Sequence, residues 1–440
     1  MRWLGHLFSI PLTALLCLTI SCGTGSSQTG LDTSFGTSGK TTLDFNSADD
    51  EAFAMGIQST GNVIIAGRMS SSGQYDFALA RLKTDGTVDT TFGTAGKTTT
   101  DFSGGNDTIY SLAILSDDTI IVAGTASGGS ASTFALAKYS KDGILDSTFG
   151  TSGKVSLPIG STQDEIRSIA ITSTGKIVAA GFSKSGSRFK VAVVRLSSTG
   201  SLDTDFNTTG KNTYFIGSGD DKALALTLQS DGKAVIAGST VTNTSTLTSQ
   251  MFVSRLSTDG TLDANYGSAG TFSISNSTQS GLKDVATGVS VLSSGGIIVS
   301  GTSDNGTAPK LLLAKSTSAG ALDTTFNSNG LLATTLNTVS ATSTTLSYVQ
   351  SEGTCQASQS NGYVIAGGIL TTSAGTDFGL LRVNPQGSAD LSFGTYGLQS
   401  LDFGSNDEPR AVVTTGSAVF VVGKAYNGAN YDFAIAKYYQ

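Results

Sequence analysis

The sequence predicts an all-β protein, a seven-bladed β-propeller of four-stranded antiparallel blades. Three observations support this prediction: a ten-residue phrase that returns seven times, short apolar segments with a period of two, and chain ends that complement each other. The 440 residues include 55 glycines and only 13% charged residues, with apolar residues throughout, so the chain is expected to fold.

The repeated phrase sets the period of the chain. It first reads LDTSFGTSGK from residue 31, and successive copies are 57 to 67 residues apart. Their aspartates are Asp32, Asp89, Asp146, Asp203, Asp263, Asp323 and Asp390. A period of this length is typical of a propeller in which every repeat supplies one sheet.

Other segments of each repeat are expected to be strands. Large residues alternate with small ones in AFAMGI (52–57) and DFALARL (76–82), and both faces are apolar, which predicts a sheet covered on both sides. The turn QSTGN (58–62) supplies a glycine for the positive φ of a tight hairpin. Because a lone four-stranded unit would expose two apolar faces, the units are expected to stack in a closed ring.

The two ends of the chain predict how the ring closes. The chain stops after DFAIAKY (432–438) without an outer strand, so the segment from residue 31 is expected to complete the last blade. A basic residue stands eight positions before each later aspartate of the phrase, and Lys437 is a seventh such cation without an aspartate after it. We expect Asp32 to pair with Lys437 across the closure, although solvated strand ends are an alternative reading of these cations.

The N-terminal residues are expected to direct export. Residues 1–21 are typical of a secretion signal, and residues 22–30 would form a lipidated cysteine and a flexible polar tether. Ile20, Ser21 and Cys22 resemble the lipobox of bacterial lipoproteins, which implies an acyl group on Cys22. Such a protein would lie at the outer membrane, the cell surface or the periplasmic face, held to the membrane only by its lipid. An ordinary secreted protein with an incidental Cys22 is the alternative.

Processing of this kind excludes several classes of chemistry. Trp3 and His6 lie in the signal, so the mature chain would lack histidine, and histidine-dependent zinc sites and Ser-His-Asp or Cys-His catalysis are excluded. Cys355 would have no cysteine partner for a disulfide. The 26 basic and 33 acidic residues, without a basic run, predict no nucleic-acid partner.

The pattern L-D-x-x-F-G-x-x-G, followed by D-G-K and V-x-A-G as in residues 231–238, resembles the delta-60 repeat family. The resemblance covers residues 31–440 and implies a propeller of exported bacterial proteins, with no catalytic or ligand residues to transfer. Asn207 and Asn327 replace the first glycine, and Tyr266 replaces the phenylalanine. The repeated aromatic residue is expected to wedge between blades.

Six aspartates stand where the innermost strands are expected to begin: Asp50, Asp107, Asp164, Asp221, Asp284 and Asp407. Ring closure would arrange them around one mouth of the channel, where clustered carboxylates would favour calcium. The preferred alternative is that each carboxylate caps its own turn or accepts backbone hydrogen bonds, with no cofactor bound.

Length variation indicates one functional face. Segments 241–249 and 337–353 are longer than their counterparts, and both connections emerge on the same face of an up-and-down blade. We expect a non-enzymatic, monomeric surface or periplasm-facing lipoprotein that acts as a binding or scaffold platform for a protein or glycan partner through these loops. Neutral drift of exposed loops explains the lengths equally well. The alternative function is a metal-dependent hydrolase or lactonase with an acidic site in the channel mouth.

Overall fold

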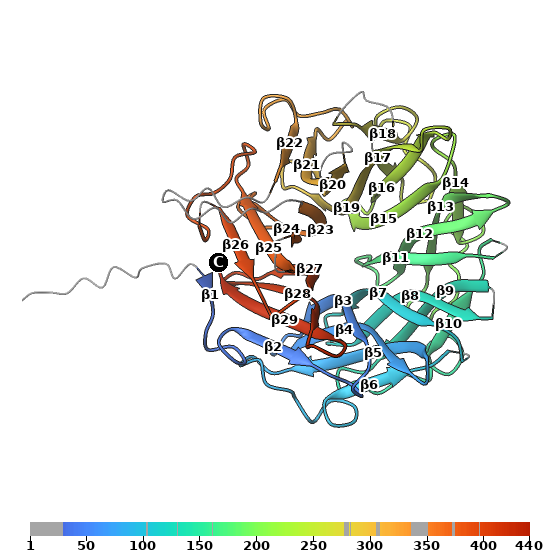
Figure 1. Cartoon of the computed structure of the whole chain (residues 1–440). Coiled ribbons are helices and arrows are strands. Elements are labelled where there is room, and N and C mark those ends of the chain that lie inside the picture. The colour runs from blue at the N-terminus through green and yellow to red at the C-terminus, as the bar shows by residue number, and fades with distance from the viewer. Residues whose placement is uncertain are drawn as a thin grey trace, which may run out of the picture.

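A computed structural model describes residues 30–440, apart from 103, 130, 161, 277–280, 282, 305–308, 336–350, 372–374 and 396. The described residues form seven blades around a central channel, each with four antiparallel strands, which confirms the predicted fold class (Figure 1). The predicted signal, Cys22 and most of the tether lie outside the described residues. Within the described part, no helix is long and apolar enough to cross a membrane.

Six blades run outward from the channel through four consecutive strands, and the last blade consists of three C-terminal strands and an N-terminal outermost strand. The innermost strands are β3 (Asp50–Ile57), β7 (Asp107–Ile114), β11 (Asp164–Ile171), β15 (Asp221–Leu228), β19 (Lys283–Val291), β23 (Ser351–Ser358) and β27 (Asp407–Thr414). The second strands are β4 (Val63–Ser71), β8 (Ile120–Gly128), β12 (Ile177–Ser185), β16 (Ala234–Asn243), β20 (Ile297–Asp304), β24 (Val364–Thr371) and β28 (Ala418–Tyr426).

The outer half of each blade holds one long and one short strand. The third strands are β5 (Gln74–Leu82), β9 (Ala131–Tyr139), β13 (Arg188–Leu196), β17 (Thr248–Leu256), β21 (Pro309–Ser316), β25 (Thr376–Val383) and β29 (Tyr431–Tyr439). The outermost strands are β6 (Lys97–Thr100), β10 (Lys154–Leu157), β14 (Lys211–Tyr214), β18 (Thr271–Ile274), β22 (Leu331–Thr334), β26 (Leu398–Leu401) and β2 (Lys40–Leu43). We number the blades 1 to 7 from β3 to β27.

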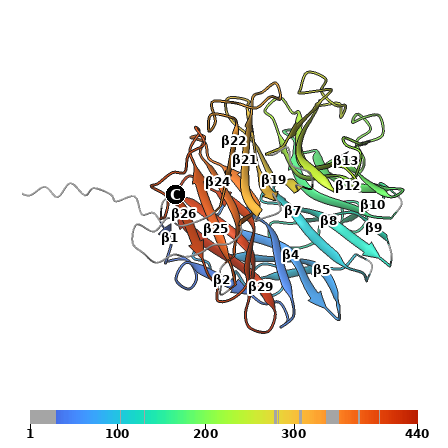
Figure 2. The ribbon, with the colours of Figure 1, turned by 45° about the horizontal axis from the view of Figure 1, so that its top comes forward.

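Strand alternation gives the ring two different faces. One face, here called the loop face, carries the second hairpin turn of each blade and the connection into the next blade, such as residues 72–73 and 101–106 in blade 1. The opposite face, here called the turn face, carries the first hairpin turn and the third connection, such as residues 58–62 and 83–96. Every innermost strand therefore starts at the loop face. Figure 2 shows the strands of one blade, β7 to β10, side by side in chain order.

The apolar core lies between neighbouring blades. The cluster between blades 7 and 1, for example, joins Phe35 and Val63 to Phe420. The repeated aromatic side chain is buried in all seven copies, as predicted for a wedge between blades: Phe35, Phe92, Phe149, Phe206, Tyr266, Phe326 and Phe393. Burial between sheets gives each junction a hydrophobic contact that the next junction repeats.

The repeat phrase itself does not form the outermost strand, in contrast to the expectation from the sequence. In blade 7 the strand β2 begins only at Lys40, and the phrase before it turns through Gly36 and Gly39 at φ of 56° and 90°. A side chain on Gly36 would meet the carbonyl oxygen of Lys40 at 2.2 Å. The left-handed backbone and this close approach favour glycine, and Asn207 and Asn327 adopt the same left-handed conformation, at φ of 45° and 46°, in the repeats that lack it. This turn keeps the phrase out of the strand.

The N-terminal strands close the ring, as predicted. Both β1 (Gly30–Leu31) and β2 pair with β29, the third strand of the last blade (Figure 1). Lys437 Nζ lies 2.9 Å from Asp32 Oδ2, and the Asp32 amide donates to the Lys437 carbonyl oxygen at 2.8 Å. The structure therefore brings together the two residues expected to pair across the closure.

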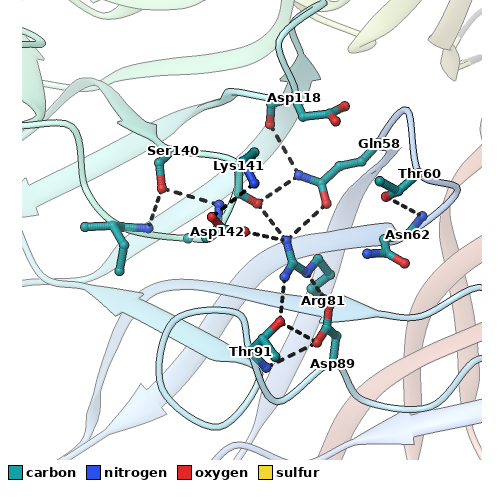
Figure 3. A network of polar contacts seen from close by, with 12 residues as sticks. Gln58, Thr60, Asn62, Arg81, Asp89, Thr91, Asp118, Ser140, Lys141 and Asp142 are labelled. Carbon is teal, nitrogen blue, oxygen red and sulfur yellow. Dashed lines mark hydrogen bonds and ion pairs between the residues drawn. The ribbon is translucent and has the colours of Figure 1, made fainter.

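The same cation–aspartate pair recurs in every blade and forms what we call the rim. The other six pairs join Arg81 to Asp89, Lys138 to Asp146, Arg195 to Asp203, Arg255 to Asp263, Lys315 to Asp323 and Arg382 to Asp390. In blade 1, Arg81 also donates to the carbonyl oxygen of Lys141 in blade 2 at 2.8 Å (Figure 3). The side chain of Arg81 is only 7% exposed, so it links two blades and is not a solvated strand end.

Candidate functional site

Every innermost strand carries a β-bulge at the same position. In β3 the register breaks between Ala52 and Ala54, so Phe53 has no partner in β4. The seven residues at these bulges all line the channel, and we call them the channel ring: Phe53, Tyr110, Arg167, Leu224, Thr287, Thr354 and Arg410. A bulge re-aims a side chain, and here it turns one residue per blade toward the axis.

A glycine in the second strand makes the bulge possible. Ala52 is opposite Gly67, and a Cβ on Gly67 would lie 1.9 Å from the carbonyl oxygen of Glu51. The glycine that ends the apolar run VIIAG therefore has a specific task, because only a residue without a side chain allows the two strands to approach at the bulge.

Four consecutive members of the ring form a continuous arginine–aromatic arc through blades 7, 1, 2 and 3. Arg410 lies with its guanidinium carbon 5.7 Å from the centre of the Phe53 ring, and Phe53 contacts Tyr110 at a centroid distance of 5.2 Å. Arg167 lies 4.1 Å from the centre of the Tyr110 ring. Burial raises the pKa of Tyr110, so its hydroxyl stays neutral at physiological pH. The remaining ring members, Leu224, Thr287 and Thr354, carry no charge.

Glutamates orient the cations of the arc. Arg167 pairs with Glu165, and Arg410 pairs with Glu408. Lys424 Nζ lies 3.6 Å from Glu408 Oε1 and also from Glu51 Oε1. Because Arg68 also pairs with Glu51, four cationic side chains face three glutamates, and one positive charge remains in excess.

The arginines keep hydrogen-bonding capacity for a ligand. Among the described residues, the buried Nε atoms of Arg68, Arg167 and Arg410 have no hydrogen-bond partner. A guanidinium has five N–H donors in a rigid fork that matches a carboxylate. The buried Nε atoms are themselves out of reach of a ligand, but the side chains of Arg167 and Arg410 are 32% and 29% exposed, so their terminal N–H groups are suited to binding an anionic group in the channel.

Two cavities meet at the ring. One, of about 230 Å³, is lined only by the seven ring residues, and the other, of about 350 Å³, continues along the innermost strands toward the turn face. Cys355 lines the second cavity, but it is 6% exposed, and burial raises its pKa to about 11, so its thiol is protonated and unreactive at neutral pH. The size of the two cavities suits a small ligand or one end of a chain.

Aromatic and cationic side chains also lie on the loop face outside the channel. Arg68 lies 4.1 Å from the centre of the Tyr75 ring, and Lys424 lies 4.2 Å from that of Tyr431. Arg188 lies 4.4 Å from the centre of the Phe215 ring, which is 48% exposed. Aromatic residues and arginine are the residue types enriched at binding interfaces, so the loop face has the composition of a recognition surface.

The six aspartates predicted at the channel mouth do not form a ring of exposed carboxylates. All six are buried, and each accepts a backbone N–H of the connection into its blade, as Asp50 does from Phe45 at 2.7 Å and Asp221 from Ile216 at 2.9 Å. The groups of neighbouring acidic residues in the described part never contain two of the six. Burial and the backbone donors hold each carboxylate within its own blade junction, as the preferred alternative expected.

The two variable segments are only partly loops. In the first, residues 241–243 belong to β16 and 248–249 to β17, so the turn itself is 244–247. In the second, residues 351–353 belong to the innermost strand β23, and 337–350 lie outside the described residues. The apolar alternation of β23 is weak in sequence, which is why this strand was assigned to the loop.

The channel ring was missed in the sequence, although a signal for it exists. The ring residue stands three positions after the aspartate that opens the innermost strand, as Phe53 follows Asp50. Strict alternation placed Phe53 on one face of a regular strand, because a bulge has no pattern of its own. Aligning the repeats on that aspartate would have exposed one position at which they differ.

Comparison with known proteins agrees with the fold. Five segments, residues 58–92, 115–149, 172–206, 229–266 and 359–393, match the model described as domain of unknown function (DUF5122) beta-propeller. These five segments are therefore similar to a β-propeller repeat whose function is not known. No curated protein matches the chain.

Solved structures resemble the chain in fold alone. An ulvan lyase of a new polysaccharide lyase family, solved with bound -[GlcA(1-4)Rha3S]-, is 9% identical with a TM-score of 0.49, covering 91% of this chain and 96% of its own. A catalytically inactive virginiamycin B lyase from Staphylococcus aureus, with quinupristin, is 11% identical with a TM-score of 0.47, covering 90% and 98%. Sqt1 from Chaetomium thermophilum is 13% identical with a TM-score of 0.40, covering 89% and 97%.

Proposed function

We propose that the protein is an exported, non-enzymatic binding propeller, a lipoprotein of the delta-60 type that is held to the envelope through Cys22. The lipobox-like residues Ile20 to Cys22 and the polar tether support export and anchoring. The propeller then serves as a rigid platform at the cell surface or in the periplasm, and it presents its loop face to a partner.

The observation that carries this proposal is the divergence of the channel ring. Repeats that keep the same cation–aspartate pair in all seven blades place five different residue types at the seven ring positions. A binding site needs different chemical groups in different places. Repeats of similar sequence can provide such groups only at the positions where their residues differ. The ring is such a place, and it lies at the channel mouth.

The chemistry of the arc favours an acidic glycan as the ligand. The aromatic rings of Phe53 and Tyr110 offer apolar surface to a sugar ring, and Arg167 and Arg410 on either side offer donors to its carboxylate. The cavities at the ring suit the end of a chain more than a broad protein surface.

Calorimetric titration with a trimer of galacturonate, and with the neutral galactose trimer, tests the proposal. The charged probe should bind, the neutral one should bind about tenfold or more weakly, and Arg167→Gln and Arg410→Gln should each weaken the charged probe about tenfold. Lys138→Gln, which removes a positive charge at the rim, is the matched control and should leave the affinity unchanged.

Two outcomes would count against this ligand. Equal affinity for the charged and neutral trimers would show that Arg167 and Arg410 do not bind the carboxylate of the ligand. Binding of a peptide with a free carboxyl end, together with no binding of either trimer, would assign the site to a protein partner instead.

The alternative function, a metal-dependent hydrolase with an acidic site at the channel mouth, has no supporting arrangement among the described residues. The seven ring positions contain no carboxylate, and Glu51, Glu165 and Glu408 are each paired with a cation. We therefore do not propose it.

A further inference from the structure

Two groups of three aspartates lie on either side of the closing blade. At the junction of blades 7 and 1, the carboxylates of Asp44, Asp50 and Asp432 each offer an oxygen within 4.8 Å of the other two. Asp377, Asp402 and Asp407 do the same at the junction of blades 6 and 7. In each group one aspartate, Asp50 or Asp407, opens the innermost strand of a blade. The other two belong to the preceding blade, where one lies on the third strand and the other directly follows the outermost strand.

Buried carboxylate oxygens in both groups lack hydrogen-bond partners. Asp50 is fully buried, and while its Oδ2 accepts the Phe45 amide, its Oδ1 has no partner among the described residues. The Oδ1 atoms of Asp407 and of Asp432, which are 0% and 6% exposed, also have none. A buried charged oxygen without a partner is costly, and either a cation or a proton relieves that cost. Asp284 Oδ1 is also buried and unpartnered, but among the described residues no other acids join it, so the unpartnered oxygen indicates a cation site only together with the neighbouring carboxylates.

The repeats themselves indicate that these acidic residues occur together. An aspartate at one register position of the third strand is present at three junctions: Asp76, Asp377 and Asp432. At the same three junctions the outermost strand is followed by a second aspartate: Asp101, Asp402 and Asp44. At the other four junctions the two positions hold Thr133 and Pro158, Lys190 and Phe215, Gln250 and Ser275, and Lys310 and Thr335. Either both additional acids are present or neither is.

The third junction with this pattern differs in one respect. Both oxygens of Asp107 accept backbone hydrogen bonds, from Phe102 at 2.8 Å and from Ser127 at 3.2 Å. Burial raises the pKa of Asp50 and of Asp407, and the corresponding amides of Ser70 and Tyr426 partly oppose this, although they make no regular hydrogen bond to the Oδ1 atoms. The Asp107 group is therefore the better satisfied of the three, and it serves below as a comparison.

Nearby basic residues do not neutralise the two groups. Lys97 donates to the backbone carbonyl oxygen of Asp44, and Lys40 donates to that of Asp402 at 2.8 Å. Lys211 makes the same contact with the carbonyl oxygen of Pro158, at a junction without the acidic group. The lysine is thus a feature of the repeat, and although Lys97 also attracts the Asp432 carboxylate, neither Lys97 nor Lys40 forms an ion pair with a member of the two groups. Where an aspartate does have its own cation, as Asp221 has Arg188 at 3.7 Å, the other acids are absent.

We propose that each of these two groups, Asp44, Asp50 and Asp432 on one side and Asp377, Asp402 and Asp407 on the other, binds one calcium ion. Three carboxylates supply hard oxygen ligands, and the exposed Asp44 and Asp402 leave room for water to complete the six to eight ligands that calcium takes. The ions would join blade 7 to blades 6 and 1, beside the strand pairing that closes the ring. This inference is independent of the proposed ligand at the channel ring.

Calcium titration of chelator-treated full-length protein, followed by calorimetry, tests the proposal. At about 1 mM calcium, in the range of extracellular sites, we expect two bound ions and a higher melting temperature. Asp44→Asn and Asp402→Asn, at exposed positions where asparagine keeps the Oδ1 that accepts the Ser47 or the Gly404 amide, should each remove one ion. Asp101→Asn, the equivalent change at the third junction, should leave both ions bound.

The outcomes separate clearly. No calcium binding by the wild-type protein would overturn the proposal, as would two bound ions in the double variant Asp44→Asn/Asp402→Asn. If Asp101→Asn lost as much calcium as Asp44→Asn, the assignment to the two junctions with unpartnered oxygens would be wrong. A circular dichroism spectrum of each variant would show that lost binding is not lost folding.

Discussion

The rim and the channel ring are built from the same seven repeats but differ in how similar those repeats are. At the rim, every blade keeps a cation, an aspartate and a buried aromatic residue, for example Arg81, Asp89 and Phe92. At the ring, equivalent positions hold phenylalanine, tyrosine, arginine, leucine and threonine. The difference is physical. Arg81, Arg195 and Arg255 of the rim each donate to a backbone carbonyl oxygen of the next blade, and the repeated aromatic residues are buried between blades, whereas each residue of the channel ring is displaced from its sheet by a bulge and faces a cavity.

This comparison teaches where a repeat protein can vary. Rim residues lie at the junctions between blades. A substitution there destabilises a junction on which the closure of the propeller depends. A ring residue makes few packing contacts, so different side chains fit at little cost in folding free energy. Changes at the rim should therefore alter stability, and changes at the ring should alter binding.

Acidification should give the largest loss of stability, because it acts on all seven rim pairs at once. Burial tends to raise the pKa of Asp89, but hydrogen bonds from Thr91 and the Arg81 guanidinium outweigh it, and the pKa is lowered. The pKa is also lowered in the other six rim aspartates. A lowered folded-state pKa stabilises the protein above the unfolded value, near 4, and this stabilisation is lost as the pH falls further. Denaturant unfolding between about pH 5 and pH 2 should show a steep fall below about pH 4. A free energy of unfolding that stays constant between about pH 4 and about pH 2 would contradict the claim that the rim pairs stabilise the fold.

Removal of one wedge should have the next largest effect. Phe92 is fully buried between blades 1 and 2, so Phe92→Ala should lower the free energy of unfolding by about 3–5 kcal/mol. Leu391→Ala, at a side chain that is 68% exposed, is the control and should change it by less than about 0.5 kcal/mol. Chemical denaturation measures both. Similar losses for the two variants would break the distinction between wedge and surface.

The closure pair should give a smaller effect. Asp32→Asn leaves Lys437 without its carboxylate at a site where the aspartate is 4% exposed, and should cost about 1–3 kcal/mol. Asp146→Asn removes the same partner from Lys138 in blade 2, where the aspartate is 26% exposed, and should cost less. If thermal unfolding gave equal losses, closure would not depend on this pair more than any other junction does.

Ring substitutions should have the smallest effect on stability. Leu224→Ser changes a residue that faces the channel, and should alter the free energy of unfolding by less than about 1 kcal/mol. Leu79→Ala, in the fully buried core of blade 1, should cost about 2–5 kcal/mol under the same denaturation assay. A loss at Leu224 as large as that at Leu79 would place the ring in the structural core.

The sequence predicts the fold well because repetition makes a local pattern visible seven times. The blade number, the role of the aromatic wedge and the pairing of Asp32 with Lys437 all follow from spacing and from the missing outer strand. Gly67 was recognised only as the end of an apolar run, since its second task, to admit the bulge, depends on the neighbouring strand.

The candidate site was predicted far less well. The aspartates at the strand starts are obvious in sequence, but whether their carboxylates face the channel or a backbone amide is decided by the connection that folds over them, as Asp50 and Phe45 illustrate. The arc of Arg410, Phe53, Tyr110 and Arg167 joins blades that are far apart in the chain, so only ring closure brings its two halves together. Periodicity carries information about regular strands, and the site lies where the strands are irregular.

Hydrogen–deuterium exchange with and without the galacturonate trimer tests the central claim most directly, because it maps the bound surface without any substitution. We predict that saturating probe slows exchange in β3, β7, β11 and β27 around the ring bulges, and leaves the rim phrase at 88–97 unchanged. Slower exchange at the rim alone, with no change at the channel ring, would contradict the claim. The claim is that the divergent channel-ring residues bind the ligand and that the repeated rim residues stabilise the fold.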